Sequence, residues 1–458
     1  MAGITGIGSG LDINSLVGAM VKSEVAPKAT QLDRQEKSAE AKFTALGKLQ
    51  GAVSGFQKAL KDLNKLSLYD NRKATSSDSN ILTASAEKTA IGGSYSVEVS
   101  QLATGSRIAS QELTEDFTAA AAGTLQISMG AADESPVSVN IAEGASLTEI
   151  RDALNEQLKD KGISANIVNN PATGESRLVL SGKETGAGND IQLSGSLGEV
   201  DFGQGVKTLQ QAQNAVFTIG GLELQSSSNT VKNAIPDVEL TLKNVTEENK
   251  PLTVTVGEDK AGVKDQLKKF VASYNELMNT TSDLTRVTQV GEGKEPLTGG
   301  LVGDATVRNL VNGVRAEMGM ANSGVEGMRV LADLGISIQK DGTLKIDDKK
   351  LDAVLDGSFD KVGEFLTGDK GLMSRLEQRV SAFAGKDGII GTRQKSIESQ
   401  RADITKQKER LEMRATQIEA RLLKQFNTMD ALVGQLTQTS SSLMASLASL
   451  PGFNGNRS

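Results

Sequence analysis

A seven-residue apolar repeat near the end of the chain, from Thr392 to Leu450, constrains the fold more than any other feature. In its first phase the repeat consists of Ile397, Ile404, Leu411 and Ile418. In a second, shifted phase it continues with Leu422, Met429, Leu436, Leu443 and Leu450. A second apolar position of the same period is occupied by Phe426, Val433 and Leu447. A period of seven with charged flanks is typical of a helix that packs along a partner helix. The alternative, a lone surface helix, rarely keeps this period so far. The spacing therefore predicts a coiled-coil or bundle helix of roughly 85 Å.

The first part of the chain contains a repeat that can supply the partner helix. Apolar residues recur every seven positions from Leu32 to Leu60, within a helix that the pattern predicts over Leu32–Leu68. We predict that the two helices meet along a seam formed by Leu32, Leu46, Val53, Leu60, Ile397, Ile404, Leu411, Ile418 and Leu422. Two long terminal helices that bracket the rest of the chain are more typical of an assembly subunit than of an enzyme.

A shorter amphipathic helix is predicted before this repeat. Asp12 is suited to cap its N-terminus, and Pro27 is expected to interrupt it. Apolar residues follow the cap at helical spacing, namely Ile13, Leu16, Val17 and Met20. So short a helix does not form alone in water, so it needs a surface on which to dock.

The middle of the chain, from Asn71 to about Val256, has the alternating pattern of β-strands. Strands are predicted at Tyr95–Val99, Thr124–Met129, Pro136–Ile141, Ile163–Val168, Arg177–Ser181, Phe217–Ile219, Leu222–Leu224, Val238–Leu242 and Leu252–Val256. Gly220 and Gly221 predict a tight hairpin turn, and Ser146 with Glu149 forms a capping box before a short helix. The fold class is therefore α+β and multidomain, with long terminal helices around two mostly β domains, one inserted in the other. Helix returns at Gly262.

Composition argues against catalysis and against several kinds of partner. The chain of 458 residues has neither cysteine nor histidine nor tryptophan. It therefore lacks thiolate nucleophiles, the Ser–His arrangement and the commonest metal ligand. We find no cofactor-binding or metal-binding motif, so we expect no enzyme activity and no cofactor. A net charge of −7 argues against nucleic acid as the main partner. No apolar run is long enough to insert in a membrane, and no cleavable signal peptide is evident.

Several segments resemble one family, the flagellar filament cap proteins, also called hook-associated proteins of the second type. The N-terminal stretch Gly6–Leu16 with Glu24–Pro27 resembles the family's signature, and Tyr95–Ala103 resembles its first β-segment. Further matches run in order along the chain, at Ser146–Leu180, Ala215–Leu242, Phe270–Asn275, Leu301–Asp304 and Leu334–Ile338. Of these, Ser146–Leu180 is similar to a short repeat carried by flagellin-related proteins.

The resemblance implies a secreted structural protein at the tip of the bacterial flagellum, exported by the type III apparatus without a cleaved signal peptide. It implies that the protein retains exported flagellin and promotes its polymerisation. The implied partners are further copies of the chain in a closed ring, expected to be a pentamer, together with flagellin, the hook–filament junction proteins and a cytoplasmic export chaperone. On this interpretation the helical ends are legs that contact the filament or the neighbouring subunits, through Ile13, Leu16, Val17, Met20, Leu436, Leu443, Leu447 and Leu450.

The expected division of the chain follows from these elements. Residues 1–38 and 428–458 form the terminal legs and are expected to be disordered in the free subunit. Residues 39–72 and 262–427 form the helical coiled-coil domain, residues 73–111 and 206–261 a β domain, and residues 112–205 an outer α/β domain. Three alternative functions stay open: an adhesin that binds host glycans or mucin through the β domains, a glycosidase with paired carboxylates, and a cytoplasmic coiled-coil scaffold.

Overall fold

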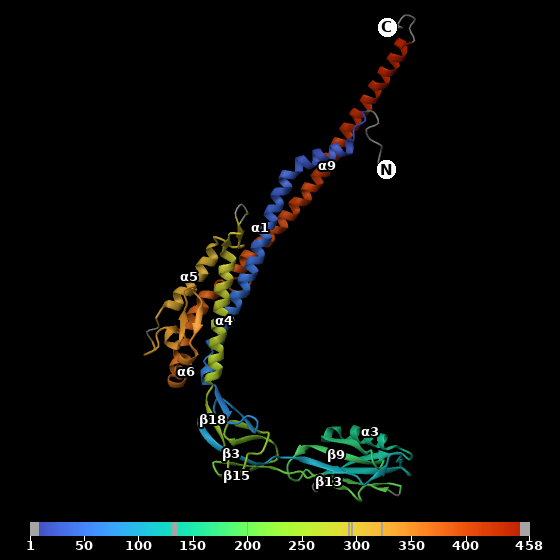
Figure 1. Ribbon diagram of the computed structural model, residues 1–458, viewed down its shortest axis with the longest axis vertical. Helices are drawn as coiled ribbons and strands as arrows, with labels where there is room; N and C mark the ends of the chain where they lie inside the picture. Colours follow the sequence, from blue (N-terminus) through green and yellow to red (C-terminus); the bar gives the residue numbers. More distant parts are fainter. Residues whose placement is uncertain are drawn as a thin grey trace. The chain divides into compact units, whose positions relative to one another are not determined.

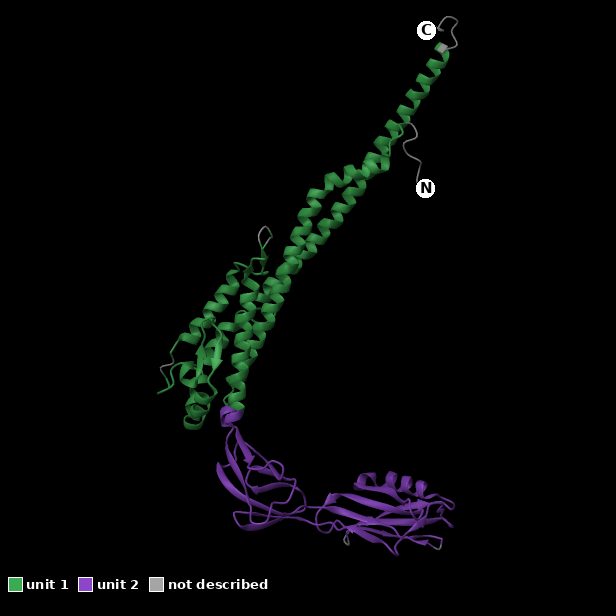
Figure 2. Cartoon of the chain, in the orientation of Figure 1, with its two compact units in different colours: residues 1–66, 262–458 green, residues 67–261 purple. Residues whose placement is uncertain are grey.

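The computed structural model describes residues 9–130, 136–198, 200–291, 294, 296–321 and 324–448. The chain divides into two compact units, residues 1–66 with 262–458 and residues 67–261 (Figure 2). The first unit is built mainly from helices, and both ends of the chain belong to it. The second unit is rich in strands. A central β-rich segment bracketed by long terminal helices confirms the predicted fold class.

The helical unit contains two long helices, α1 (Ile13–Leu63) and α9 (Ile389–Ala448), which lie side by side in Figure 1. Its remaining elements are α4 (Lys260–Thr285), β19 (Val287–Thr288), β20 (Leu297–Thr298), α5 (Ala305–Gly319), β21 (Ile336–Ile338), β22 (Leu344–Ile346), α6 (Asp348–Gly357), α7 (Phe359–Leu366) and α8 (Leu372–Ser381). Asp347 caps α6, since its side chain accepts a hydrogen bond from the backbone N–H of Lys350.

The helices α1 and α9 are antiparallel. Near the middle of the pair, Lys408 of α9 bridges Asp33 and Glu36 of α1, with nitrogen–oxygen distances of 2.5 and 2.6 Å. Toward the end of α1, a Cβ added at Gly47 would lie 3.6 Å from Gln394, which shows how closely the helices pack there. Antiparallel packing lets one chain supply both helices of the predicted coiled coil.

The expectation that Pro27 interrupts the first helix is wrong, because α1 runs without a break from Ile13 to Leu63. The predicted cap is confirmed, since the Asp12 side chain accepts a hydrogen bond of 3.0 Å from the backbone N–H of Ser15. Proline removes one backbone donor from a helix and bends it without necessarily ending it. Figure 1 shows a bend in the dark-blue part of α1. Packing along α9 holds both sides of the bend in helical conformation.

The core of the helical unit forms where α1 meets α4. Phe56 of α1 is completely buried, and its ring centroid lies 5.8 Å from that of Phe270 and 5.9 Å from that of Tyr274, both on α4. The Tyr274 hydroxyl donates a hydrogen bond of 3.0 Å to the carbonyl oxygen of Gly342, in the turn between β21 and β22. Aromatic rings thus join α1 and α4, and one hydroxyl attaches the small hairpin to them.

The strand-rich unit contains α2 (Ser67–Asp70) and two separate hydrophobic cores. Around the first core lie β1 (Arg72–Ser76), β2 (Leu82–Ala86), β3 (Gly93–Gln101), β14 (Ala215–Ile219), β15 (Leu222–Ser226), β16 (Thr230–Ile235), β17 (Val238–Leu242) and β18 (Leu252–Glu258). They form a five-stranded sheet in the order β1-β18-β3-β14-β15 and a three-stranded sheet in the order β16-β17-β2. The predicted hairpin is confirmed, since Gly220 and Gly221 join β14 to β15 with φ angles of 59° and 83° that favour glycine.

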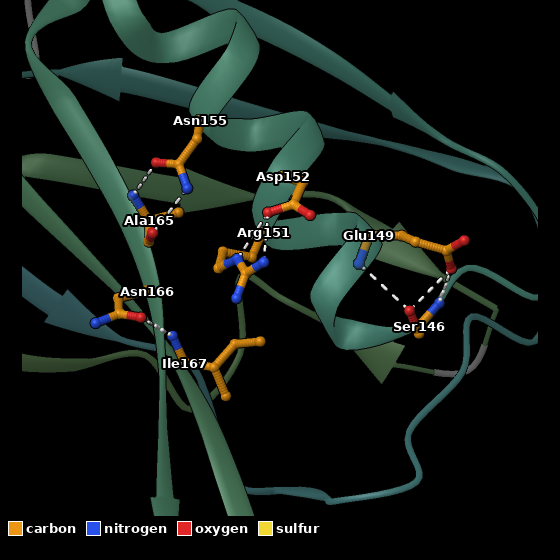
Figure 3. Close-up of polar contacts among 8 residues, drawn as sticks. All are labelled: Ser146, Glu149, Arg151, Asp152, Asn155, Ala165, Asn166 and Ile167. Carbon is orange, nitrogen blue, oxygen red and sulfur yellow. Dashed lines mark hydrogen bonds and ion pairs between the residues drawn. The ribbon is translucent and has the colours of Figure 1, made fainter. Parts of the chain in front are cut away.

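The second core is formed by the part of the chain between β3 and β14. Its elements are β4 (Gly105–Ala109), β5 (Leu113–Thr114), β6 (Gly123–Met129), β7 (Val137–Ile141), α3 (Leu147–Leu158), β8 (Ile163–Asn170), β9 (Glu175–Thr185), β10 (Ile191–Ser194), β11 (Ser196–Leu197), β12 (Val200–Asp201) and β13 (Lys207–Gln210). The capping box is confirmed: Ser146 accepts a hydrogen bond from the N–H of Glu149, and the Glu149 carboxylate accepts one from the N–H of Ser146 (Figure 3). The helix that it starts buries Ile150, Leu154 and Leu158.

One side chain of α3 protects the edge of a sheet. Among the described strands, β8 pairs with β9 alone. The Asn155 amide faces the outer side of β8, where it donates a hydrogen bond of 2.9 Å to the carbonyl oxygen of Ala165 and accepts one of 2.7 Å from its N–H (Figure 3). Exposed strand edges are templates for unwanted pairing with other chains. The Asn155 amide occupies the donor and the acceptor that such pairing would use.

We predict that Asn155→Leu destabilises the second core by about 1–3 kcal/mol, because the backbone groups of Ala165 lose their partners in a partly buried place. Hydrogen exchange at the Ala165 amide, measured at increasing concentrations of denaturant, gives this loss of stability. Gln157→Leu is the matched control, since Gln157 lies exposed on the same helix. Equal stability of the two variants would contradict the role of Asn155.

Candidate functional site

The candidate site is the pair of terminal helices, and its first part is the seam between them. On α1, Leu32, Leu46, Val53 and Leu60 are all completely buried. On α9, Ile404 and Ile418 are buried, whereas Ile397, Leu411 and Leu422 are half-buried. Leu32, Ala39 and Ile404 form one cluster, against which Ile397 and Leu411 pack. Leu32, Ile397, Ile404 and Leu411 of the predicted seam therefore lie together at the contact between α1 and α9. The pairing of the other seam residues stays a prediction.

The predicted contact strip at the start of α1 is divided by the fold. Ile13 and Val17 are 1% exposed, whereas Leu16 and Met20 are 42% and 43% exposed. Consecutive apolar residues of a helix span more than one face, and the position of α9 decides which of them are covered. Leu16 and Met20 are therefore the residues of this strip that a partner can reach in the structure. Their role in binding stays a prediction.

The other predicted strip lies at the end of α9. Leu436, Leu443 and Leu447 are 69%, 58% and 46% exposed, and Leu450 lies outside the described residues. Ser9, the first described residue, contacts Asp430, and Figure 1 shows α9 continuing beyond the start of α1. Within the described residues, α9 after Asp430 thus has no helix of the same chain beside it. Exposed leucines along a helix of this length are typical of a surface that binds another molecule.

The end of α9 is also free of charge. The sequence from Ala431 to Leu450 contains no Asp, Glu, Lys or Arg. Three of its hydroxyl groups, those of Thr437, Thr439 and Ser441, donate to the carbonyl oxygens four residues earlier, each at 2.8 Å. These donors are satisfied within the helix, so burial of this surface against a partner leaves them paired.

A partly buried ion pair fixes the other end of α9. The guanidinium of Arg393 contacts both carboxylate oxygens of Asp304 at 2.7 Å, and the Asp304 side chain is only 10% exposed. Asp304 also caps α5 through the N–H of Thr306. The hydrogen bond from Arg393 holds the pKa of Asp304 below its usual range. The pair attaches the start of α9 to the start of α5, so α9 leaves the helical unit from a fixed point.

Sequence patterns did not predict three of these features: the Asn155 bridge, the pair of Asp304 with Arg393, and the contact of Ser9 with Asp430. Leu301–Asp304 was singled out only as part of a family resemblance. No other signal in the sequence connects these residues, because single polar contacts between distant segments leave no period in the chain.

The described part of the chain contains neither a cluster of acidic side chains able to hold a metal ion nor a helix long and apolar enough to cross a membrane. The candidate site consists of the helix surfaces described above. It defines a class of structural subunit, one whose paired terminal helices carry exposed apolar surfaces at their ends.

Comparisons with known proteins identify the family within this class. Residues 9–106 match the family model for the N-terminus of flagellar hook-associated protein 2, and residues 212–438 match the model for its C-terminus. Residues 124–184 match the flagellin hook IN motif. The chain belongs to the flagellar hook-associated protein 2 family.

Individual relatives match along the whole chain. The A-type flagellar hook-associated protein 2 of Pseudomonas aeruginosa is 46% identical over 98% of each chain. The B-type protein of the same species is 39% identical over the full length of both. Among solved structures, the D1-D2-D3 domains of the flagellar cap protein FliD from Escherichia coli match with a TM-score of 0.56 and 28% identity, over 77% of this chain and 99% of that one.

Proposed function

We propose that this chain is a structural cap at the distal tip of the bacterial flagellar filament, where it retains exported flagellin and promotes its polymerisation. The observation that carries this proposal is the family match along the whole chain, and the E. coli relative of solved structure is itself a flagellar cap protein. The exposed, uncharged end of α9 supports it, because a cap has to bind a filament through surfaces that the subunit itself leaves open. The comparisons support this function rather than the adhesin alternative.

The proposed cap is secreted by type III export and closes into a ring with further copies of itself. Every subunit of a closed ring presents two complementary surfaces, so the exposed helix ends and the strand-rich unit are both available for contacts. Its further proposed partners are flagellin, the hook–filament junction proteins and a cytoplasmic export chaperone. None of these contacts requires a cofactor.

We also propose a division of labour within the chain. Residues 1–38 and 428–458 act as legs, through the exposed residues Leu16, Met20, Leu436, Leu443 and Leu447. We propose that in the free subunit, where no filament covers them, these segments exchange between the helix pair described above and a disordered state. Residues 39–72 and 262–427 form the helical domain that holds the legs. The β domain (73–111, 206–261) and the outer domain (112–205) form the plate over the filament end. The two separate hydrophobic cores support a division into two domains. Since β4 and β13 belong to the sheet of the second core, we propose that the boundary lies just before Gly105 and just after Gln210.

Deletion of the gene tests the proposal directly. Cells without the protein are expected to secrete unpolymerised flagellin into the medium and to make short filaments or none. Electron microscopy counts and measures the filaments, and gel analysis of the medium measures the free flagellin. Re-expression of the intact chain is the control and should restore filament length. Normal filaments in the deletion strain would contradict the cap function.

A further inference from the structure

The first residues of the structure fasten the start of α1 to α9. Both the backbone N–H and the side-chain hydroxyl of Ser9 donate to one carboxylate oxygen of Asp430, at 2.8 and 2.6 Å. Gly10 has a φ of +72°, a conformation that favours glycine, and it directs the chain from this contact to the Asp12 cap of α1. A double hydrogen bond to a carboxylate thus lies at the tip of α1.

Burial along the first part of α1 is uneven. Ile13 and Val17, next to the Ser9 contact, are 1% exposed. The apolar residues that follow, Val21, Val25 and Ala29, are only half-buried, and full burial resumes at Leu32. The segment is therefore held firmly at its two ends and loosely in between.

The loosely held part contains the bend. Pro27 lacks the N–H that a helix interior would direct to the carbonyl oxygen of Ser23. A surface hollow borders Pro27, and its walls come from α1 alone, including Ser23, Thr30 and Arg34. The apolar neighbours of Pro27, Val25 and Ala29, are only half-buried, so little packing opposes a change of the bend angle at this point.

One other polar contact between this segment and α9 is an ion pair of Glu24 with Arg414, at 3.9 Å. Both side chains are largely exposed, so the pair contributes little to stability. The attachment of the segment thus depends mainly on Asp430, Ile13 and Val17. Since the helices are antiparallel, the contact of Ser9 with Asp430 places Ile13 opposite Phe426 and Val17 opposite Leu422. Both of these α9 residues are half-buried.

We propose that Ser9–Ala26 is a movable arm, with Pro27 as its hinge and the contact of Ser9 with Asp430 as its latch. In the latched state, the arm covers Ile13 and Val17 together with the facing side chains of α9. In the open state, Ile13 and Val17 become exposed and form one apolar surface with Leu16 and Met20. If the proposed cap function holds, the latch controls how much apolar helix surface the leg offers to the filament.

Hydrogen exchange of the purified full-length chain tests the arm and its latch. In the unaltered protein, amides of residues 13–26 are expected to exchange faster than those of residues 39–63. Asp430→Ala removes both hydrogen bonds of Ser9. It should therefore accelerate exchange in residues 13–26 by about tenfold, with residues 39–63 unchanged. Asp430→Asn keeps an acceptor oxygen at the same place and should retain most of the protection.

Two further variants complete the test. Pro27→Ala restores the missing donor at the hinge and should slow exchange in residues 13–26. Ser38→Ala is the control, because Ser38 lies exposed on α1 beyond the hinge, and it should change nothing. The proposal is overturned if residues 13–26 exchange as slowly as residues 39–63, or if Asp430→Ala leaves their exchange unaltered. This measurement requires no flagellin, so its failure is distinct from failure of the cap function.

Discussion

Replacement of Phe56 by alanine is expected to lower the free energy of unfolding of the helical unit by about 3–5 kcal/mol. The Phe56 ring is completely buried and packs between Phe270 and Tyr274 at centroid distances below 6 Å. Its removal leaves a cavity and also ends two aromatic contacts, each of which contributes to stability beyond the buried area. Because the cavity lies where α1 meets α4, its effect should extend to the whole helical unit.

Chemical denaturation, monitored by far-UV circular dichroism at the helical band, measures this loss of unfolding free energy. Leu66→Ala removes a side chain that is 64% exposed, and it should change the stability by less than about 0.5 kcal/mol. The melting of the strand-rich unit should be the same in both variants. A Phe56→Ala protein with the stability of the Leu66→Ala control would show that the ring is not part of the core.

The second large effect concerns function. Leu16→Ser together with Met20→Ser should abolish normal filament growth and release unpolymerised flagellin into the medium. Both side chains are more than two-fifths exposed, so their replacement should leave the fold and the helix pair intact. If the arm contacts the filament through these residues, two apolar contacts are lost from every leg of the ring.

Filament length in a strain that carries only the doubly substituted protein measures this effect, with circular dichroism as the check on folding. Ser38→Ala with Lys42→Ala, on exposed positions of the same helix, is the control and should support normal filaments. Normal filaments with the Leu16 and Met20 variant would exclude these residues from the contact. They would not exclude a cap function that depends on the end of α9.

The parts of the fold that sequence reasoning predicted are those with local chemistry. The period of seven in α9, the two glycines before β15 and the capping box at Ser146 each act within a few residues. Each of them therefore leaves a signal that can be recognised without knowledge of the fold. The strip at the start of α1 shows the limit of such patterns. Its period indicates a helix, but the surrounding fold determines that Ile13 is buried and Leu16 exposed.

The features that sequence reasoning missed depend on contacts between distant segments. Ser9 and Asp430 are separated by 421 positions in the chain, and Arg393 and Asp304 by 89. A single polar pair has no period, and its two residue types are common throughout the sequence. Pro27 shows the opposite error. The local rule that proline ends a helix predicted a break, but contacts with other parts of the chain keep α1 continuous there. The buried residues on either side of it, Val17 and Leu32, hold both parts of α1 in place, and the helix continues through the proline.

The absence of charge at the end of α9 has a consequence for the surroundings in which a flagellum works. Ions in the medium weaken attractions between exposed charges, and at seawater strength they do so within a few ångströms. Contacts made through Leu436, Leu443 and their uncharged neighbours do not depend on such attractions. The strength of these proposed contacts should therefore differ little between fresh and salt water, or between mildly acidic and mildly alkaline media. A cap attached through them would stay bound when the salt concentration or the pH around the cell changes.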